Sequence, residues 1–184
     1  MKKTLWIILG IIVLIAIWFF SVYNSLVKAS ENIDNQWAQV ETQYQRRVDL
    51  IPNLVSSVKG VMKQEQTIFD NLANARTKYA GATSADQKAA ASLELEQGLG
   101  RLLVVMENYP TLKSSENVQT LMVQLEGTEN RISVERKNYN DLVKDFNIRV
   151  KRIPTNLIAS VLGYSERAYF QADSVAKFSP KVEL

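Results

Sequence analysis

Three charged residues stand at positions where the helical repeats of this sequence are otherwise apolar: Glu65, Glu129 and Arg136. If the helices that carry the two glutamates run antiparallel with tight connections, their carboxylates lie at a similar height in the interior. Inward-facing carboxylates bind pairs of metal ions in di-iron helical bundles, and two acids placed on either side of a glycosidic bond hydrolyse it. Metal binding and glycan hydrolysis are therefore the two chemistries to consider first.

The composition argues against both chemistries. The 184 residues include no histidine and no cysteine. The Glu-x-x-His element of di-iron bundles, the commonest general base and the thiolate nucleophile are therefore all missing. A glycan hydrolase would also need an open cleft, and tightly packed helices are expected to leave none. We therefore expect no enzyme, no catalytic residue, no metal site and no cofactor.

A structural interpretation of the three charged residues is simpler. They are expected to form a buried polar layer in which Arg136 or Arg101 neutralises the carboxylates and sets the register of the helices. A contact with a partner helix and a metal site are the two alternatives that the sequence leaves open.

Charge is spread evenly along the chain. The 22 basic and 19 acidic residues interleave and give a formal net charge of +3. A protein that binds nucleic acid usually concentrates its positive charge in a patch or tail. We therefore expect no nucleic-acid partner.

The N-terminal stretch is the most apolar part of the chain. Residues 1–4 form a short basic flank, and residues 5–23 are apolar apart from Ser21. As a helix this stretch is about 28 Å long, close to the hydrocarbon thickness of a bilayer. A cleaved signal peptide would have a shorter apolar run and a small-residue cleavage site. The stretch predicts a retained single-pass transmembrane helix, and Lys2 and Lys3 favour a cytoplasmic N-terminus with the bundle outside the cytoplasm.

Apolar residues repeat at intervals of seven, or of four and three, through the rest of the chain, as in helices packed on helices and in coiled coils. Leu26, Ile33 and Val40 form one predicted row, Leu54, Val58 and Val61 belong to a second, and the row of the fourth helix includes Tyr139 and ends at Ile153. We predict an all-α fold in which the transmembrane helix continues into an antiparallel four-helix bundle over residues 24–153. The expected helices cover residues 24–48, 53–80, 85–108 and 115–152. Breaks are placed at Pro52 and at Tyr109-Pro110 because proline lacks a backbone donor and disfavours helix before it, and at Gly81 to Ser84.

A charged cluster surrounds the first expected break. Arg46, Arg47 and Asp49 precede Pro52, and Asn53 follows it. Asp49 or Asn53 is the expected cap of the next helix. Capping and charge pairing at the end of the bundle farthest from the membrane is the simpler interpretation, and a recognition tip for a partner is the alternative.

An antiparallel bundle returns its fourth helix to the membrane, which brings a basic rim near the lipid headgroups. The rim consists of Lys144, Arg149, Lys151 and Arg152. We expect residues 154–184 to form a short membrane-proximal helix and a tail, with residues 156–164 on the bilayer surface or over the bundle end. The alternative is a last helical turn with a solvated charge cluster.

Several short blocks of the sequence together form a specific signature. They are Tyr23-Asn24-Ser25-Leu26-Val27, the run Q-R-R-V-D-L-I-P-N-L-V over residues 45–55, Lys59-Gly60, Glu107-Asn108-Tyr109-Pro110-Thr111-Leu112-Lys113, Glu129-Asn130-Arg131-Ile132 with Arg136, and Tyr139-Asn140. The chain resembles the LemA family of bacterial membrane proteins in these blocks, which extend from the apolar stretch to about Phe170. One departure is Gln64, which stands where the family often has a histidine before Glu65 and so removes a starting point for a metal site.

The resemblance implies a single-pass anchor in the bacterial cytoplasmic membrane, a helical bundle and no established enzyme activity. It also implies that some members act in membrane remodelling or as partners of membrane proteases. Our first functional hypothesis is a non-enzymatic scaffold or adaptor at the cell envelope that binds other membrane proteins or self-assembles into a homo-oligomer. The alternative is a protein that binds or remodels the bilayer surface through the basic rim and the amphipathic C-terminal segment.

Overall fold

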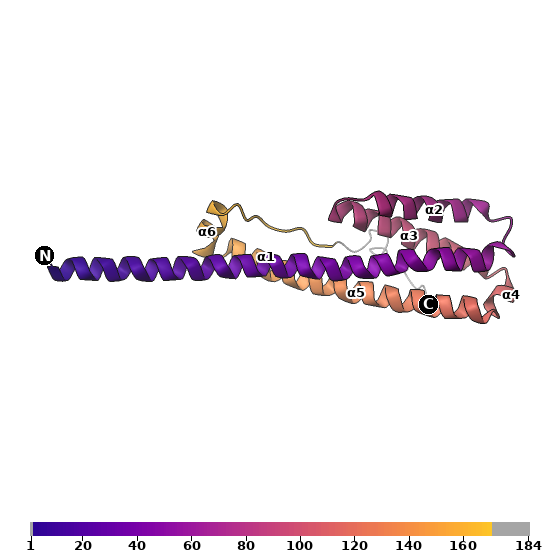
Figure 1. Cartoon of the computed structure of the whole chain (residues 1–184), viewed down its shortest axis with the longest axis horizontal. Helices are drawn as coiled ribbons and strands as arrows, with labels where there is room; N and C mark the ends of the chain where they lie inside the picture. Colours follow the sequence, from indigo (N-terminus) through magenta and orange to yellow (C-terminus); the bar gives the residue numbers. More distant parts are fainter. Residues whose placement is uncertain (1, 171–184) are drawn as a thin grey trace, which may run out of the picture. The chain divides into compact units, whose positions relative to one another are not determined.

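The computed structural model describes residues 2–170. These residues contain six α-helices and no β-strand, which confirms the all-α prediction (Figure 1). The helices are α1 (Lys2–Lys59), α2 (Gln66–Gly81), α3 (Ala85–Met106), α4 (Pro110–Lys113), α5 (Glu116–Lys151) and α6 (Thr155–Val161). Residues 171–184 of the expected tail lie outside the described residues.

The helices form two compact units. Unit 1 consists of residues 2–36 and 136–170, and unit 2 consists of residues 37–135. α6 belongs to unit 1, whereas α2, α3 and α4 belong to unit 2, and α1 and α5 contribute residues to both. Each unit buries its own apolar side chains.

α1 passes through Pro52, so the helix break expected there is wrong. A proline in a helix interior removes one hydrogen bond and costs about 3 kcal/mol. The apolar stripe nevertheless continues on both sides of it, with Val48, Ile51, Leu54 and Val58 no more than 4% exposed. Each such side chain contributes about 1.5–3 kcal/mol when fully buried. A continuous helix is therefore favoured because burial along the stripe outweighs the proline.

The chain turns back after α1, at residues 60–65 (Figure 1). The N–H groups of Val61 and Met62 donate to the carbonyl of Val58 at 3.1 and 3.0 Å, which ends the helix. Met62 is then fully buried, whereas Val61, which the heptad pattern placed in the core, is 48% exposed. Glu65 is the residue before α2. The second helix therefore begins at Gln66 and not at residue 53, and Glu65 lies in a turn instead of a helical seam.

α2 and α3 lie side by side in unit 2 (Figure 1). α3 begins with a capping box, in which the hydroxyl of Ser84 accepts from the N–H of Gln87 and the Gln87 side chain accepts from the N–H of Ser84. Farther along α3, Gly98 faces Leu72 of α2, and a Cβ at Gly98 would lie 2.8 Å from the Leu72 Cδ2. The missing side chain therefore allows α2 and α3 to approach closely.

Unit 1 packs α6 and the last part of α5 against α1. Its core contains Leu26 and Ile33 of α1, Val143 and Phe146 of α5, and Ile158 and Ala159 of α6. Phe19 and Val22, at the end of the apolar stretch of α1, pack against the same cluster. α6 therefore lies close to the place where the apolar stretch ends.

The apolar stretch of α1 is exposed over most of its length, with Phe19 and Val22 partly buried. Its most apolar window of 18 residues has a mean hydropathy of 2.8, and none of that window is buried within the protein. Soluble proteins rarely expose a continuous apolar surface of this size to water. Among the described residues, α1 is the one helix that is long and apolar enough to cross a membrane.

Candidate functional site

The interior of unit 2 holds a buried cation, the guanidinium of Arg47 on α1, whose side chain is 2% exposed. Nη2 of Arg47 is ion-paired with Glu129 of α5, and Nη1 lies 3.6 Å from Glu96 of α3. Nη1 also donates to the carbonyl and hydroxyl oxygens of Ser92, both at 3.4 Å. Three helices therefore meet at one guanidinium.

This cluster fixes the register of the helices around it. A buried guanidinium is strongly unfavourable unless its donors are satisfied, and its planar fork suits carboxylates that approach from two sides. A shift of α1 by one residue would take Arg47 away from both carboxylates. A polar layer with Arg136 or Arg101 as its cation was expected here, but the cation beside Glu129 is Arg47, and Arg101 lies exposed on α3.

The cluster neutralises charge without activating a nucleophile. The hydroxyl of Ser92, which is 1% exposed, faces an arginine that cannot accept its proton. Glu65 lies in the turn between α1 and α2, whereas Glu129 lies in the fourth turn of α5, so they form no carboxylate pair. Among the described residues, no group of three or more His, Cys, Asp or Glu side chains is placed to hold a metal ion.

An apolar groove, the α3–α5 groove, opens beside the Arg47 cluster. Its cavity of about 450 Å³ is lined by Leu99, Gly100, Leu103, Met122, Val123 and Leu125, together with Arg47, Asn130 and the carboxylates of Glu96, Glu126 and Glu129. A neighbouring hollow shares Leu103 and Val123 and extends the groove to Met106. The expectation that the helices leave no cleft is therefore wrong, and one reason is that Gly100 supplies no side chain to fill the space.

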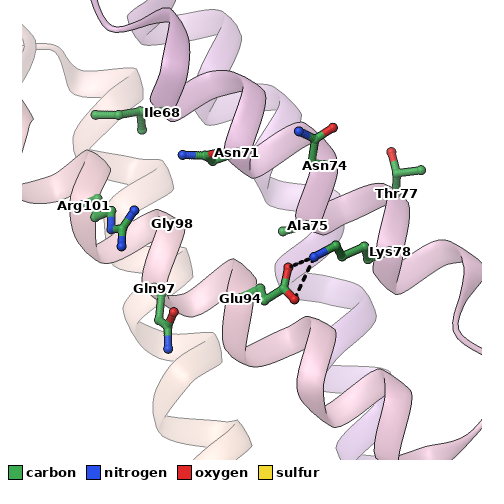
Figure 2. A pocket seen from close by; sticks show the side chains of 10 residues that line it. All are labelled: Ile68, Asn71, Asn74, Ala75, Thr77, Lys78, Glu94, Gln97, Gly98 and Arg101. Carbon is green, nitrogen blue, oxygen red and sulfur yellow. Dashed lines mark hydrogen bonds and ion pairs between the residues drawn. The ribbon is translucent and has the colours of Figure 1, made fainter. Parts of the chain in front are cut away.

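A polar cavity of about 510 Å³ lies between α2 and α3 (Figure 2). Across this cavity, Nζ of Lys78 on α2 donates hydrogen bonds to both carboxylate oxygens of Glu94 on α3, at 2.9 and 2.7 Å. The side chains of Asn71, Asn74 and Gln97 also line the cavity. Its lining contains one carboxylate, so it lacks the pair of acids that hydrolysis would need. We interpret the exposed Lys78–Glu94 pair as a link between two helices.

In unit 1, residues 163–170 follow α6 as an extended segment, the α6 tail, whose main chain is bound by asparagine side chains. Asn147 of α5 accepts from the N–H of Arg167 at 2.8 Å and donates to the carbonyl of the same residue at 2.9 Å. Asn140, one heptad earlier on α5, binds the N–H and carbonyl of Phe170 at 2.8 and 3.1 Å. Each carboxamide therefore satisfies a main chain that has no neighbouring strand.

Aromatic side chains hold the two ends of the α6 tail. The ring of Tyr164 packs edge-on against Phe146, with centroids 5.8 Å apart. The ring of Phe170 lies 4.9 Å from that of Tyr139, and the guanidinium of Arg136 lies 5.8 Å from the Phe170 centroid. Arg136 and Tyr139, which the sequence placed in a helical seam, therefore contact the α6 tail.

Charged side chains contact the middle of the α6 tail. Nη1 of Arg167 lies 3.5 Å from a carboxylate oxygen of Asp34, and its Nη2 donates to the hydroxyl of Ser30 at 3.1 Å. Nζ of Lys151 lies 2.7 Å from Glu166, and this hydrogen bond raises the pKa of Lys151. Both ion pairs are exposed to solvent, so each adds little to stability.

Apolar side chains are exposed along one edge, which is formed by α6 and the residues before it. Ile153 is 78% exposed, Leu157 67% and Val161 82%, at intervals of four residues. The other edge buries Ile158 and Ala159 in the unit 1 core. Ile153 was expected to end the apolar row of the fourth helix, but α5 ends at Lys151 and Ile153 therefore faces solvent.

The four residues of the expected basic rim lie in unit 1. Nη1 of Arg149 donates to the hydroxyl of Ser25 at 2.7 Å, and Lys151 pairs with Glu166. Lys144 and Arg152 are exposed. The rim is therefore partly occupied by contacts within the protein.

The cluster expected at the first break does not cap a helix, because no helix begins there. Arg46 and Asp49 are exposed on α1, and Asp49 accepts a hydrogen bond from the side chain of Gln45 at 2.8 Å. Asn53 lies inside α1, and its main-chain carbonyl accepts from the hydroxyl of Ser57. The capping interpretation is therefore wrong for these residues.

The second proline-containing motif does form a chain reversal. Glu107 follows α3, Tyr109 precedes α4, and Pro110 is the first residue of α4. Pro110 is suited to this position because the first helical residue needs no N–H partner. Asn130, the remaining motif residue, is exposed at the α3–α5 groove.

Tyr79 of α2 is a buried phenol in unit 2. Its side chain is 4% exposed, and burial, with smaller contributions from Glu41, Tyr44 and Asp49, raises the pKa of Tyr79 to about 12. Its ring packs edge-on against Tyr44, with centroids 6.3 Å apart. Tyr79 is therefore neutral at physiological pH and acts as a core residue.

Glu96, Asn147 and Arg167 were not predicted from the sequence. Asn147 could have been found, because it follows Asn140 by seven residues and lies on one face of the helix with Val143 and Val150. Arg167 lies midway between Tyr164 and Phe170 at a spacing of three, which is a signal for an extended segment. Glu96 carries no comparable signal because acidic residues are common on helix surfaces.

The exposed apolar stretch of α1 and the two helical units define a membrane-associated all-α protein. The chain belongs to the LemA family, whose sequence profile matches residues 36–184. This match confirms the resemblance seen in the short sequence blocks.

The chain is similar to curated proteins named MamQ and LemA. Magnetosome protein MamQ 2 of Paramagnetospirillum magneticum is 29% identical over 175 residues, covering 81% of this chain and 64% of the relative. MamQ of Magnetospirillum gryphiswaldense is 25% identical, covering 80% and 64%. Protein LemA of Metamycoplasma hominis is 25% identical, covering 92% and 80%. The chain thus spans less than two thirds of the length of the MamQ proteins, and none of these names states a catalytic activity.

Proposed function

We propose that this protein is a non-enzymatic, membrane-anchored adaptor that binds a helix of another membrane protein in the α3–α5 groove. The observation that carries this proposal is the groove itself, an apolar depression that remains open in unit 2. Leu103 is 37% exposed and Val123 is 68% exposed on its two sides. Grooves of this kind bind the apolar face of an amphipathic helix.

The charges around the groove indicate the chemistry of the partner. Glu96, Glu126 and Glu129 lie among its lining residues, and Arg47 is already paired within the unit. A partner helix with leucine or phenylalanine anchors and flanking lysine or arginine residues complements this surface. We further propose that α1 crosses the bilayer once, with the N-terminus in the cytoplasm and the units outside it.

A matched pair of substitutions tests the adaptor function. Val123→Asp places a charge in the groove, whereas Val104→Asp changes a side chain of nearly equal exposure, 67%, that is not among the groove residues. We expect Val123→Asp, and not Val104→Asp, to remove the partner recovered by crosslinking the intact protein in native membranes. Equal recovery with both variants, each helical by circular dichroism, would exclude the groove as the docking site.

The absence of cysteine from the chain makes the proposed orientation testable. Lys137, on α5, has a side chain that is 75% exposed. In intact spheroplasts we expect Lys137→Cys to react with a membrane-impermeant maleimide. Reaction only after lysis would place the units in the cytoplasm.

A second candidate function, binding to the bilayer surface, is favoured by the apolar edge of Ile153, Leu157 and Val161. α6 packs near Phe19 and Val22, where the apolar stretch of α1 ends, so this edge lies near the expected lipid headgroups. Lys144 and Arg152 supply exposed positive charge for anionic lipid. An amphipathic helix with this arrangement lies in the interface with its apolar edge inserted.

Depth-dependent quenching distinguishes an inserted from a solvated α6. A fluorophore on Leu157→Cys, in the full chain in vesicles, should be quenched by spin-labelled acyl chains, whereas one on Lys137→Cys should be quenched by aqueous iodide. Equal aqueous quenching at both positions would remove the basis for surface binding.

A further inference from the structure

The α6 tail is bound with a period of three residues. Tyr164, Arg167 and Phe170 contact α1 and α5, and of the exposed residues between them Glu166 adds an ion pair with Lys151. Three residues of a polyproline II chain span about 9.3 Å, and seven residues of an α-helix span about 10.5 Å. Asn140 and Asn147 are therefore spaced to bind every third residue of such a chain.

The two asparagines bind main-chain groups of the segment and not its side chains. Each carboxamide uses its oxygen for the N–H and its nitrogen for the carbonyl of one residue. Any extended segment offers the same groups. Selectivity comes from the rings of Phe146 and Tyr139 at the ends and from Asp34 in the middle, which together suit an aromatic-x-x-Arg-x-x-Phe sequence.

The α6 tail is bound more weakly to unit 1 than the helices that it covers are bound to one another. Its ion pairs are exposed, with Arg167 at 41% and Glu166 at 53%. At its beginning, Gly163 adopts a φ of +77°, which glycine adopts without strain and other residues rarely adopt. The segment is therefore able to leave the site from Gly163 onward while Ile158 and Ala159 stay in the core.

We propose that this face of unit 1, built on Asn140 and Asn147, is a binding site for an extended peptide of the form aromatic-x-x-Arg-x-x-Phe. The ligand comes from two sources, the chain's own α6 tail and the α6 tail of a second copy. Exchange of the tails links two copies reciprocally, as in domain swapping.

A second copy of the chain is the partner that necessarily carries a segment matching this site. Every copy carries both the asparagine face and the segment that fits it, so the exchanged contacts are the same as those made within one chain. Confinement of copies to one bilayer raises their effective concentration for each other. This proposal is independent of the adaptor function, which depends on the α3–α5 groove of unit 2.

Peptide binding tests the site itself. The probe is a fluorescent peptide of residues 163–170, added to the full chain in nanodiscs. We expect the variant Arg167→Ala/Phe170→Ala, whose own tail is weakened, to bind the peptide at least tenfold more tightly than the wild type. Adding Asn140→Ala/Asn147→Ala should weaken binding at least tenfold while helicity by circular dichroism is kept. Because Asn147 is buried, Asn140→Ala alone serves as the milder variant and should weaken binding several-fold.

Crosslinking between tagged copies distinguishes the two sources. One copy carries Lys151→Cys and the other Glu166→Cys, residues whose side chains are ion-paired across the site, and a short bis-maleimide joins them in vesicles. We expect crosslinked heterodimers that are reduced at least fivefold when Lys137→Cys replaces Lys151→Cys, because Glu166 is paired with Lys151. Heterodimers that persist with Lys137→Cys would overturn the exchange, and a tail-weakened variant that binds the peptide no better than its asparagine double mutant would overturn the site.

Discussion

The two units satisfy their buried polar groups in different ways. Unit 2 buries a full charge, Arg47, and neutralises it with carboxylates from two other helices. Unit 1 keeps a core of apolar and aromatic side chains and buries a neutral amide, Asn147, against the main chain of the α6 tail. The charge requires partners fixed on the helices themselves, whereas the amide requires only an extended main chain.

The polar contacts of unit 2 therefore stabilise its packed helices, whereas those of unit 1 hold a segment that is able to detach. Removing Arg47 leaves two carboxylates without their cation among packed helices, so the helices themselves lose stability. Removing Asn147 frees a segment whose N–H and carbonyl groups regain hydrogen bonds from water when it detaches. We therefore expect global effects from the polar cluster of unit 2 and local effects from that of unit 1.

The largest expected effect is that of Arg47→Ala. Truncating one partner of a buried ion pair costs about 3–5 kcal/mol, and we expect about 2–3 kcal/mol here because Glu96 and Glu129 are 35% and 42% exposed and can be rehydrated. The measurement is the free energy of unfolding of the full chain in detergent micelles, followed by circular dichroism. Arg46→Ala, at the exposed neighbouring position, should change it by less than about 0.5 kcal/mol. A similar loss in both variants would contradict the special position of Arg47.

Gly98→Ala should have the next largest effect in unit 2. The new methyl group would lie 2.8 Å from Cδ2 of Leu72, which is fully buried and has little room to move. Overpacking costs about 1–3 kcal/mol and the helix propensity of alanine offsets up to about 1 kcal/mol of it, so we expect a net loss of up to about 2 kcal/mol, measured in the same way. Gly100→Ala is the matched control on the same helix, since a Cβ there meets nothing within 4 Å, and it should stabilise the protein by up to about 1 kcal/mol through helix propensity.

Asn147→Ala should have a smaller and more local effect. Two hydrogen bonds to Arg167 are lost, which costs about 1–2 kcal/mol of attachment of the α6 tail at the usual net value per bond. Hydrogen exchange should accelerate in residues 163–170 and remain unchanged in α2 and α3. Faster hydrogen exchange throughout unit 2 would show that the effect of the substitution is not confined to unit 1 and would contradict the prediction.

The smallest effect at neutral pH is expected for Tyr79→Phe. The hydroxyl of Tyr79 donates to the carbonyl of Glu41 over a long distance of 3.5 Å, so its loss should be nearly neutral. The pKa of Tyr79 is raised from 10.0 to about 12 by burial, so between these values the unfolded chain releases a proton that the folded chain keeps. Folding stability should therefore fall as pH rises from 10 to 12, and this part of the fall should be absent in Tyr79→Phe. The check is the pH dependence of unfolding in the two proteins, and parallel curves would contradict it.

Much of the helical architecture could be predicted from heptad spacing. Leu26, Ile33 and Val40 form a predicted row, and each is no more than 1% exposed. The same pattern failed at Val61, because it carried the apolar row through a turn. The error arose at Pro52. The helix boundary was placed there because of the local free-energy cost of proline, but the burial of apolar side chains on both sides of Pro52 outweighs this cost.

The candidate sites were less predictable than the helices. The sequence indicated that Glu129 needs a cation, but Arg47 was assigned to a helix end because the expected break would have placed it there. The α6 tail was expected to be helix or surface segment as far as Tyr164, and its binding by Asn140 and Asn147 was not foreseen. Contacts of this kind join residues that are 20 and 30 positions apart in the chain, so local propensity carries no information about them.

Residue type and spacing were enough to predict the apolar stretch of α1, the all-helical class and the apolar rows, and to exclude histidine and cysteine chemistry. These features act locally. The packed fold was needed to show that α1 continues through Pro52, that Arg47 is the cation beside Glu129 and that asparagines bind the α6 tail. Each of these features depends on interactions between residues that are distant in the sequence. Burial and hydrogen bonding stabilise such interactions only after the helices have packed.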